Sequence, residues 1–229
     1  MDISLLVKIL IGIAYGLLLS VVCFPVSKKL ILSRTEDPAE AALLGNKLVK
    51  IFVYILSILS SVGIMLTATD AVQAVRSLLL LIPMFSIALV DSLIRKIPNP
   101  LLLVMIVIQL IYVAYVCITS HSIKLLEISL FGFFIGFVAC TLPSLFRIPV
   151  GAGDIKYSAV IGLCIYMSGY IQAMLIMGII VLFFLIGLKI KKRGGLKTQI
   201  PMGPFLSAGT VITMCFPLLD SLVAKVSMF

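Results

Sequence analysis

Charged residues are scarce in this chain. Of its 229 residues, 12% are charged and 62% are hydrophobic, and the mean hydropathy is +1.28. A soluble domain carries about 25% charged and about 45–50% apolar residues, so the composition excludes a soluble globular enzyme and a disordered chain. At about 20 residues per membrane-spanning helix, the length allows at most about eight or nine spans, without a separate soluble domain.

The residues that build most metal and nucleophilic sites are also sparse. The only histidine, His121, is expected in a solvated loop on the outer side. The five cysteines lie scattered in apolar runs without a C-x-x-C pair, which indicates neither a zinc site nor a disulfide framework. No serine occurs in a G-x-S-x-G pattern, and Gly151-x-Gly153 lacks the third glycine of a dinucleotide loop because position 156 is lysine. We therefore expect no metal and no cofactor.

The few charges divide the chain into apolar runs. These are residues 9–27, 51–69, 77–90, 97–123, 128–146, 157–188 and 198–219. Run 77–90 reaches the length of a span if its helix begins near Ala71, which leaves Arg76 about a turn inside, where it can snorkel to the interface. Run 157–188 is too long for one ordinary span, and Ser168-Gly169 offers a turn that divides it into two helices. The first run lacks an A-x-A cleavage site and is expected to be a retained helix rather than a signal peptide.

The distribution of basic residues favours eight spans over seven. With eight spans, one side holds 14 of the 18 Lys and Arg, in the loops at 28–50, 91–97, 147–156 and 189–200. The positive-inside rule assigns that side to the cytoplasm. We predict an all-α, polytopic integral membrane helix bundle of about eight transmembrane helices, with both termini outside. Residues 1–70 are expected to form two N-terminal helices joined by a polar cytoplasmic loop, and residues 71–229 a six-helix core.

The predicted topology divides the nine acidic residues into two groups by their position. Seven are expected in loops, at the start of the chain or near the outer ends of helices: Asp2, Glu36, Asp37, Glu40, Asp70, Glu127 and Asp220. Asp91 and Asp154 remain, both at cytoplasmic helix ends, and the two spans between them return the chain to the same side. Because a charge in the hydrocarbon costs about 2.5–3.5 kcal/mol, each needs a partner or a function. Structural alternatives are a helix-capping role for Asp154 and an ion pair between Asp91 and Arg95.

Two carboxylates at one depth suit the hydrolysis of an amide by water. Within about 3–5 Å of each other they tend to share one proton. The ionised member takes a proton from water and the protonated member polarises the scissile carbonyl, without a metal or a covalent intermediate. Gly151 and Gly153 allow a sharp turn before Asp154, which would open a short helix. The same pair could serve a proton-coupled transporter, but such carboxylates usually lie near the bilayer midplane.

Three segments carry a resemblance to a known family. Gly151-Ala-Gly153-Asp154 resembles the GxGD motif of the membrane aspartyl peptidases. Asp91, with Pro98 and Asn99 after it, resembles the first catalytic aspartate region of the type IV prepilin peptidases, which include the preflagellin peptidases. The segment 200–206, which contains Gly203-Pro204, is similar to the glycine–proline segment that opens the family's last helix. The three elements occur in the family's order over about residues 73–225.

The resemblance implies an aspartic-type endopeptidase. It would cleave the basic leader from type IV prepilin-like or pseudopilin substrates at the cytoplasmic face of the cell (inner or plasma) membrane, with Asp91 and Asp154 as the catalytic pair. Other residues would shape the site or bind substrate: Gly151, Gly153, Lys156, Pro98, Asn99, Gly203 and Pro204. Its partners would be this substrate and the lipid bilayer, with no nucleic acid. Family members with dual function carry a zinc-binding insert with two C-x-x-C pairs, which this short form lacks, so methyltransferase activity is not expected.

Three other functions are alternatives. The first is the small proton-coupled transporter that would use Asp91 and Asp154. The second is another GxGD protease of the presenilin or signal-peptide-peptidase type, which has a Pro-Ala-Leu segment where this chain has Pro201-Met202-Gly203-Pro204. The third is a non-catalytic assembly protein of a pilus or secretion machine. The sequence leaves open the exact substrate, the role of the first two helices and the oligomeric state.

Overall fold

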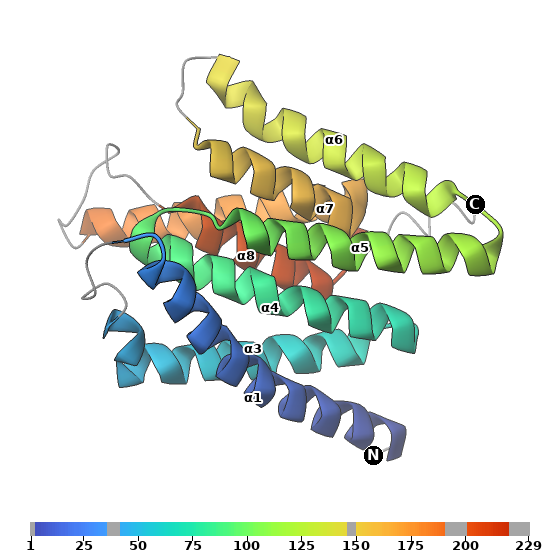
Figure 1. The fold of residues 1–229 in the computed structure, drawn as a ribbon, viewed down its shortest axis with the longest axis horizontal. Coiled ribbons are helices and arrows are strands. Elements are labelled where there is room, and N and C mark those ends of the chain that lie inside the picture. The colour runs from blue at the N-terminus through green and yellow to red at the C-terminus, as the bar shows by residue number, and fades with distance from the viewer. Residues whose placement is uncertain (1–2, 36–41, 146–149, 191–200, 220–229) are drawn as a thin grey trace.

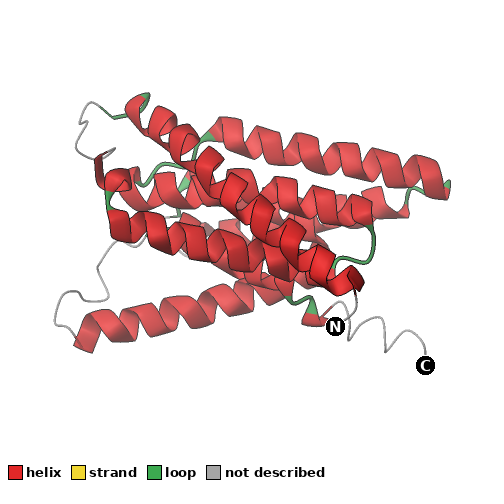
Figure 2. Ribbon diagram, turned by 90° about the horizontal axis from the view of Figure 1, so that it is seen from below, coloured by secondary structure: helices red, strands yellow, loops and turns green. Residues whose placement is uncertain are grey.

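The chain folds into a bundle of long helices. The computed structural model describes residues 3–35, 42–145, 150–190 and 201–219, and these contain helices and no strand (Figures 1 and 2). The helices are α1 (Ile3–Leu32), η1 (Leu43–Gly45, 3₁₀), α3 (Lys47–Thr67), α4 (Ala71–Ile94), α5 (Asn99–Ser120), α6 (Lys124–Leu145), α7 (Ala152–Ile190) and α8 (Met202–Cys215). Six of them are long and apolar enough to cross a membrane, and α8 is a shorter apolar helix. The predicted polytopic helical membrane bundle is confirmed.

Helix α7 is broken at Tyr166, whose φ of 61° and ψ of −176° are not helical. The hydroxyls of Ser158 and Tyr170 lie 2.7 Å apart, although their separation of twelve positions would span about 18 Å of straight helix. The two halves of α7 therefore run in opposite directions (gold and orange in Figure 1). The predicted division of run 157–188 is confirmed, but the break lies at Tyr166 rather than at Ser168-Gly169.

Arg76 stabilises this break, and the prediction that it snorkels to the interface is wrong. Its side chain is buried and donates from Nη1 to the carbonyl oxygen of Cys164, at 3.1 Å. The break removes the usual amide partner of such a carbonyl near the end of a helical segment. A cation there also interacts favourably with the negative end of the helix dipole. Arg76 points into the bundle because hydrogen-bond acceptors from other helices surround its guanidinium there. The hydropathy of its apolar run does not show these acceptors.

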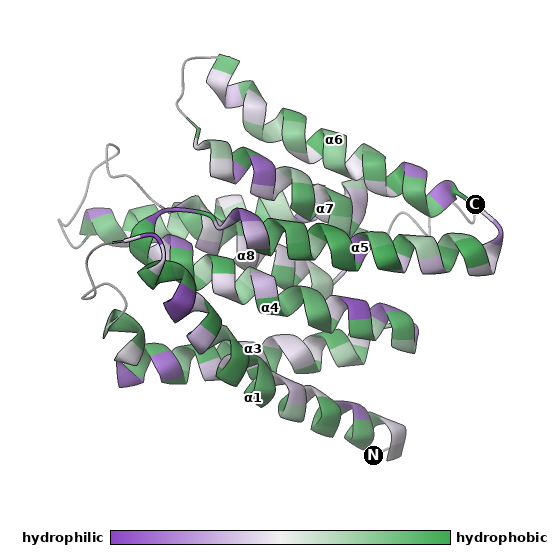
Figure 3. Cartoon of the chain, in the orientation of Figure 1, coloured by the Kyte–Doolittle hydropathy of each residue, from purple (hydrophilic) through white to green (hydrophobic). Residues whose placement is uncertain are grey.

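Successive helices alternate in direction, so the helix ends next to the loops that were predicted to share a side lie at one end of the bundle (Figure 1). We call this the aspartate end, because α4 ends there just after Asp91 and α7 begins there just before Asp154. Asp70 and His121 lie at the opposite end, where His121 is exposed, as predicted. Figure 3 shows apolar residues along most of each helix between the two ends.

Part of the predicted polar loop at 28–50 is helical instead. Helix α1 continues to Leu32, so Lys28 and Lys29 lie in its last turns. The acidic residues of that loop, most of the basic cluster at 189–197 and Ile200 of the glycine–proline segment lie outside the described residues.

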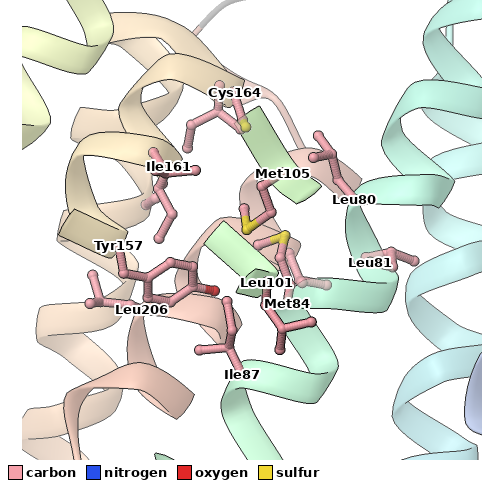
Figure 4. Packing of buried hydrophobic residues seen from close by; sticks show 14 of the residues in the cluster. Leu80, Leu81, Met84, Ile87, Leu101, Met105, Tyr157, Ile161, Cys164 and Leu206 are labelled. Atoms are coloured by element: carbon pink, nitrogen blue, oxygen red, sulfur yellow. The ribbon is translucent and has the colours of Figure 1, made fainter. Parts of the chain in front are cut away.

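The main hydrophobic core lies between α4, α7 and α8. Figure 4 shows the ring of Tyr157 from α7 next to Leu206 of α8 and facing Met84 and Ile87 of α4. The cluster extends to Leu19 and other residues of α1 and α3. Helix α4 is thus surrounded by the others, and its last turn is held in place from several sides.

Helices α6 and α7 touch through glycines. A Cβ atom added to Gly162 would overlap the carbonyl oxygen of Gly132, and one added to Gly132 would overlap that of Gly162. Close contact of small residues is a main source of helix association in lipid, where apolar burial between helices contributes little.

We expect Gly162→Ala to lower the thermal midpoint of the purified protein, because the added methyl must push α6 from α7. Overpacking of this kind costs about 1–3 kcal/mol. Gly187→Ala on the same helix is the control, since nothing lies within 4 Å of its added Cβ. Equal midpoints for the two variants, measured in the same detergent, would contradict the close contact.

Candidate active site

Asp91 is held rigidly in the last turn of α4. Its side chain is buried, with 4% of its surface exposed. The backbone N–H of Gly203, in the first turn of α8, donates to Asp91 Oδ2 at 2.9 Å. The helix ends at Arg95, whose φ of 51° is left-handed and whose N–H donates to the Asp91 carbonyl oxygen at 3.0 Å. Both the backbone and the carboxylate of Asp91 therefore have fixed partners.

Glycine at position 203 is required by this contact. A Cβ atom there would lie 2.7 Å from Asp91 Oδ2 and 2.9 Å from its Cβ, closer than atoms of these kinds approach. Pro204 follows within the first turn of α8, where its missing N–H is not needed. The start of α8 thus presents a bare backbone N–H to the carboxylate, and the helix dipole adds to the attraction.

Asp154 lies in the first turn of α7 and is half-buried. Gly151 is exposed, and a Cβ on it would lie 2.8 Å from Asp154 Oδ2. A Cβ on Gly153 would lie 3.2 Å from Cβ of Ile97, so the α4–α5 connection packs directly against this turn. Because the two glycines lack side chains, the Asp154 carboxylate can lie close to the backbone at Gly151, and the start of α7 can pack against the α4–α5 connection.

The structure brings the two aspartates together. They come from different helices at the aspartate end, and their carboxylates are near enough to interact electrostatically. The charge of Arg95 also acts on Asp91. Two interacting carboxylates, one buried and one accessible, are an arrangement that can share a proton and activate a water molecule.

The comparisons with known proteins agree with this geometry. Residues 78–186 match the model of the type IV leader peptidase family. This segment belongs to that family. Neither a curated protein nor a solved structure matches the chain. The matched leader peptidase segment begins in α4 and ends in the second half of α7, so it includes both Asp91 and Asp154, whereas Gly203 lies beyond it.

Two hydrogen-bonded side chains, Tyr157 of α7 and Ser207 of α8, lie about one helical turn from the aspartate end and connect these two helices. Ser207 donates to the carbonyl oxygen of Gly203 at 2.8 Å, and because a serine has one hydroxyl hydrogen, Tyr157 donates to Ser207 at 2.7 Å. Sequence reasoning did not single out either residue. The signal that could have found them is spacing, since Tyr157 lies three positions after Asp154 and Ser207 four after Gly203, which places each on the same helix face.

The other residues predicted for the candidate site lie around its edge. Pro98 is buried and caps the start of α5, whereas Asn99 and Lys156 are exposed. In the described part of the chain, Lys156 makes no hydrogen bond or ion pair with either aspartate. Arg34, just beyond α1, donates to the carbonyl oxygen of Ile97 at 3.4 Å, so the N-terminal region reaches the same edge. The described residues contain no group of three or more His, Cys, Asp or Glu side chains that could hold a metal ion.

Proposed function

We propose that the protein is an aspartic-type endopeptidase that removes the basic leader from type IV prepilin-like or pseudopilin substrates, with Asp91 and Asp154 as its catalytic pair. The observation that supports this most is the meeting of a buried and a half-buried carboxylate inside the segment that matches the leader peptidase family. The family itself supports a leader peptidase role in general. The aspartic mechanism and the substrate class are the further steps of the proposal.

In the proposed reaction, a water molecule lies between the two carboxylates, which together carry one proton. The ionised carboxylate takes a proton from the water as its oxygen attacks the scissile carbonyl carbon. The protonated carboxyl donates a hydrogen bond to the carbonyl oxygen and stabilises the developing charge. The tetrahedral intermediate then collapses, the C–N bond breaks, and the leaving nitrogen receives the proton that the water gave up. The hydrogen bond from Gly203 keeps Asp91 oriented throughout.

The position of the pair favours a peptidase over a proton-coupled transporter. Both carboxylates lie at one end of the bundle rather than near the middle of their helices. We propose that this end faces the cytoplasm, because the four sequence segments that were predicted to share a side hold 14 of the 18 basic residues, and Asp91 and Asp154 lie in two of them. The apolar helix of the substrate would dock laterally from the bilayer of the cell membrane, and its leader junction would unwind at the aspartate end.

We also propose that the two parts of the chain have different roles. Residues 71–229 would form the catalytic core, and residues 1–70 would support it. Helix α1 packs on α4, and the Tyr15 hydroxyl donates to the carbonyl oxygen of Leu78 at 2.8 Å. Because the chain has no C-x-x-C pair, it would act as a peptidase without methyltransferase activity.

The test is cleavage of a synthetic prepilin-like peptide by the purified protein. The peptide carries a basic leader, a glycine and an apolar helix with glutamate at its fifth position. We expect one cut between the leader and the helix, found by intact mass, and no added methyl group when S-adenosylmethionine is present. A matched peptide with glutamine in place of the leader's lysines should be cut more slowly. No cleavage, or cuts within the apolar helix, would contradict the proposal.

A further inference from the structure

Arg76 marks a second polar site, at the end of the bundle opposite to the aspartates. It lies fifteen positions before Asp91 on α4, which is about 22 Å along the helix. Its side chain is 93% buried, and Nη1 donates to Gln109 Oε1 and to the Tyr166 hydroxyl, each at 3.1 Å. The guanidinium also lies over the ring of Tyr112, with 4.6 Å from Cζ to the ring centre.

The positive charge of Arg76 has no carboxylate partner within the described residues. A buried charge is normally paired, because leaving water is costly. The Cys164 carbonyl and the tyrosine ring stabilise the cation, but they bring no negative charge. In the part of the chain that the structure describes, the three hydrogen bonds of the guanidinium all use Nη1, and the buried Nε has no partner. One edge of the guanidinium therefore keeps unused donors.

A pocket opens beside this cation. It has a volume of about 530 Å³ including its open mouth, and residues of α3, α4, α7 and α8 line it. Thr67, Gln73 and Thr213 contribute polar side chains to its wall together with Arg76. Thr213 is 2% exposed. Among the described residues, neither its hydroxyl nor the Gln109 amide nitrogen behind Arg76 has a hydrogen-bond partner. We call this cavity the Arg76 pocket.

We propose that the Arg76 pocket binds a phosphate group. An unpaired cation with unused donors suits an anion, which accepts hydrogen bonds and balances the charge. The Nε edge of a guanidinium presents two parallel N–H donors that match the oxygens of a phosphate, and a threonine hydroxyl can supply another. The pocket lies near the start of α4, where phospholipid headgroups would lie if this end marks a membrane boundary. Free phosphate and a phospholipid headgroup offer the same chemistry, and the experiment separates them.

The test measures the thermal midpoint of the purified full-length protein in detergent at increasing ligand concentration. The ligands are inorganic phosphate, dihexanoyl phosphatidylglycerol, and dihexanoylglycerol as the control that lacks phosphate. A ligand that binds only the folded state stabilises it by RT ln(1 + [L]/Kd), so the midpoint rises with ligand concentration. We expect one or both phosphate ligands to raise the midpoint and dihexanoylglycerol to leave it unchanged.

Two variants connect this binding to the pocket. Arg76→Lys keeps the charge but loses the planar fork, and we expect about tenfold weaker binding. Because Arg76 also stabilises the break in α7, Thr213→Val is the deciding variant. It removes an unpaired hydroxyl, so the midpoint without ligand should stay equal or rise, while binding weakens by about fivefold. Thr210→Val is the matched control, because the Thr210 hydroxyl already donates to the Leu206 carbonyl oxygen and lies outside the pocket wall.

The possible results distinguish a soluble phosphate ligand from a lipid headgroup. Stabilisation by inorganic phosphate identifies a soluble ligand, and stabilisation by phosphatidylglycerol alone identifies a lipid headgroup. Either result supports the site if Thr213→Val weakens it and Thr210→Val does not. No shift of the wild-type midpoint with either ligand, or equal affinity of Thr213→Val and wild type, would overturn the proposal.

Discussion

Asp91→Asn and Asp154→Asn are each expected to reduce leader cleavage at least about 10³-fold while the protein remains folded. Asparagine has nearly the shape of aspartate but cannot take a proton from water or share one with its neighbour. The amide oxygen can still accept the Gly203 N–H at position 91, so the packing at the start of α8 should survive. The measurement is the initial rate of peptide cleavage, with the thermal midpoint as a check on folding.

Asp70→Asn is the matched control for these two variants. Asp70 lies at the opposite end of α4 and caps it, its carboxylate accepting the Gln73 N–H at 2.7 Å. Asparagine caps helices about as well as aspartate, so this change should alter neither stability nor cleavage. Near-normal cleavage by Asp91→Asn or Asp154→Asn would show that the carboxylate in question is not part of the catalytic pair.

Gly203→Ala is expected to lower cleavage about 100-fold without changing any titratable group. The added methyl would overlap the Asp91 carboxylate, so either that side chain or the start of α8 must move. A displacement of about 1 Å at a catalytic group can reduce the rate by this amount. The loss should appear mainly in kcat, because the substrate's apolar helix would contact other surfaces.

Gly178→Ala provides the comparison for this prediction. It is the same chemical change in the second half of α7, where nothing lies within 4 Å of the added Cβ. It should cleave at the wild-type rate and be as stable as wild type or slightly more so. If Gly203→Ala were also within about threefold of wild type, the close contact between α8 and Asp91 would have no role in catalysis.

The sequence predicted the helices and the shared end of the two aspartates for a simple reason. With so few charges, each one limits where a span can lie, and an even number of spans between Asp91 and Asp154 requires that they share an end. The same reasoning located the approximate ends of most helices. It could not give the close packing of Gly203 against Asp91, because contacts between distant segments depend on how the helices rotate about their axes. The resemblance to the family, rather than hydropathy, pointed to that segment.

Two features required the structure because they depend on partners far away in the chain. The break in α7 falls at Tyr166, a residue without special turn propensity, and Arg76 from another helix stabilises it through the Cys164 carbonyl. Turn propensity favoured Ser168-Gly169, which begins two positions later. Arg76 itself was expected to reach for the interface, since a single sequence shows a charge in an apolar run but not the acceptors around it.

In the proposed mechanism Asp91 and Asp154 act as one unit, and the double variant tests this most directly. Cleavage of the prepilin-like peptide would be followed for wild type, each Asp→Asn variant and the double variant, over incubations long enough to quantify very slow rates by mass. Residues that work as a unit lose most of their contribution when either is removed, so the double variant should be no more than about tenfold slower than the slower single variant. Losses that multiply in the double variant, or a single variant that cleaves at close to the wild-type rate, would contradict the account.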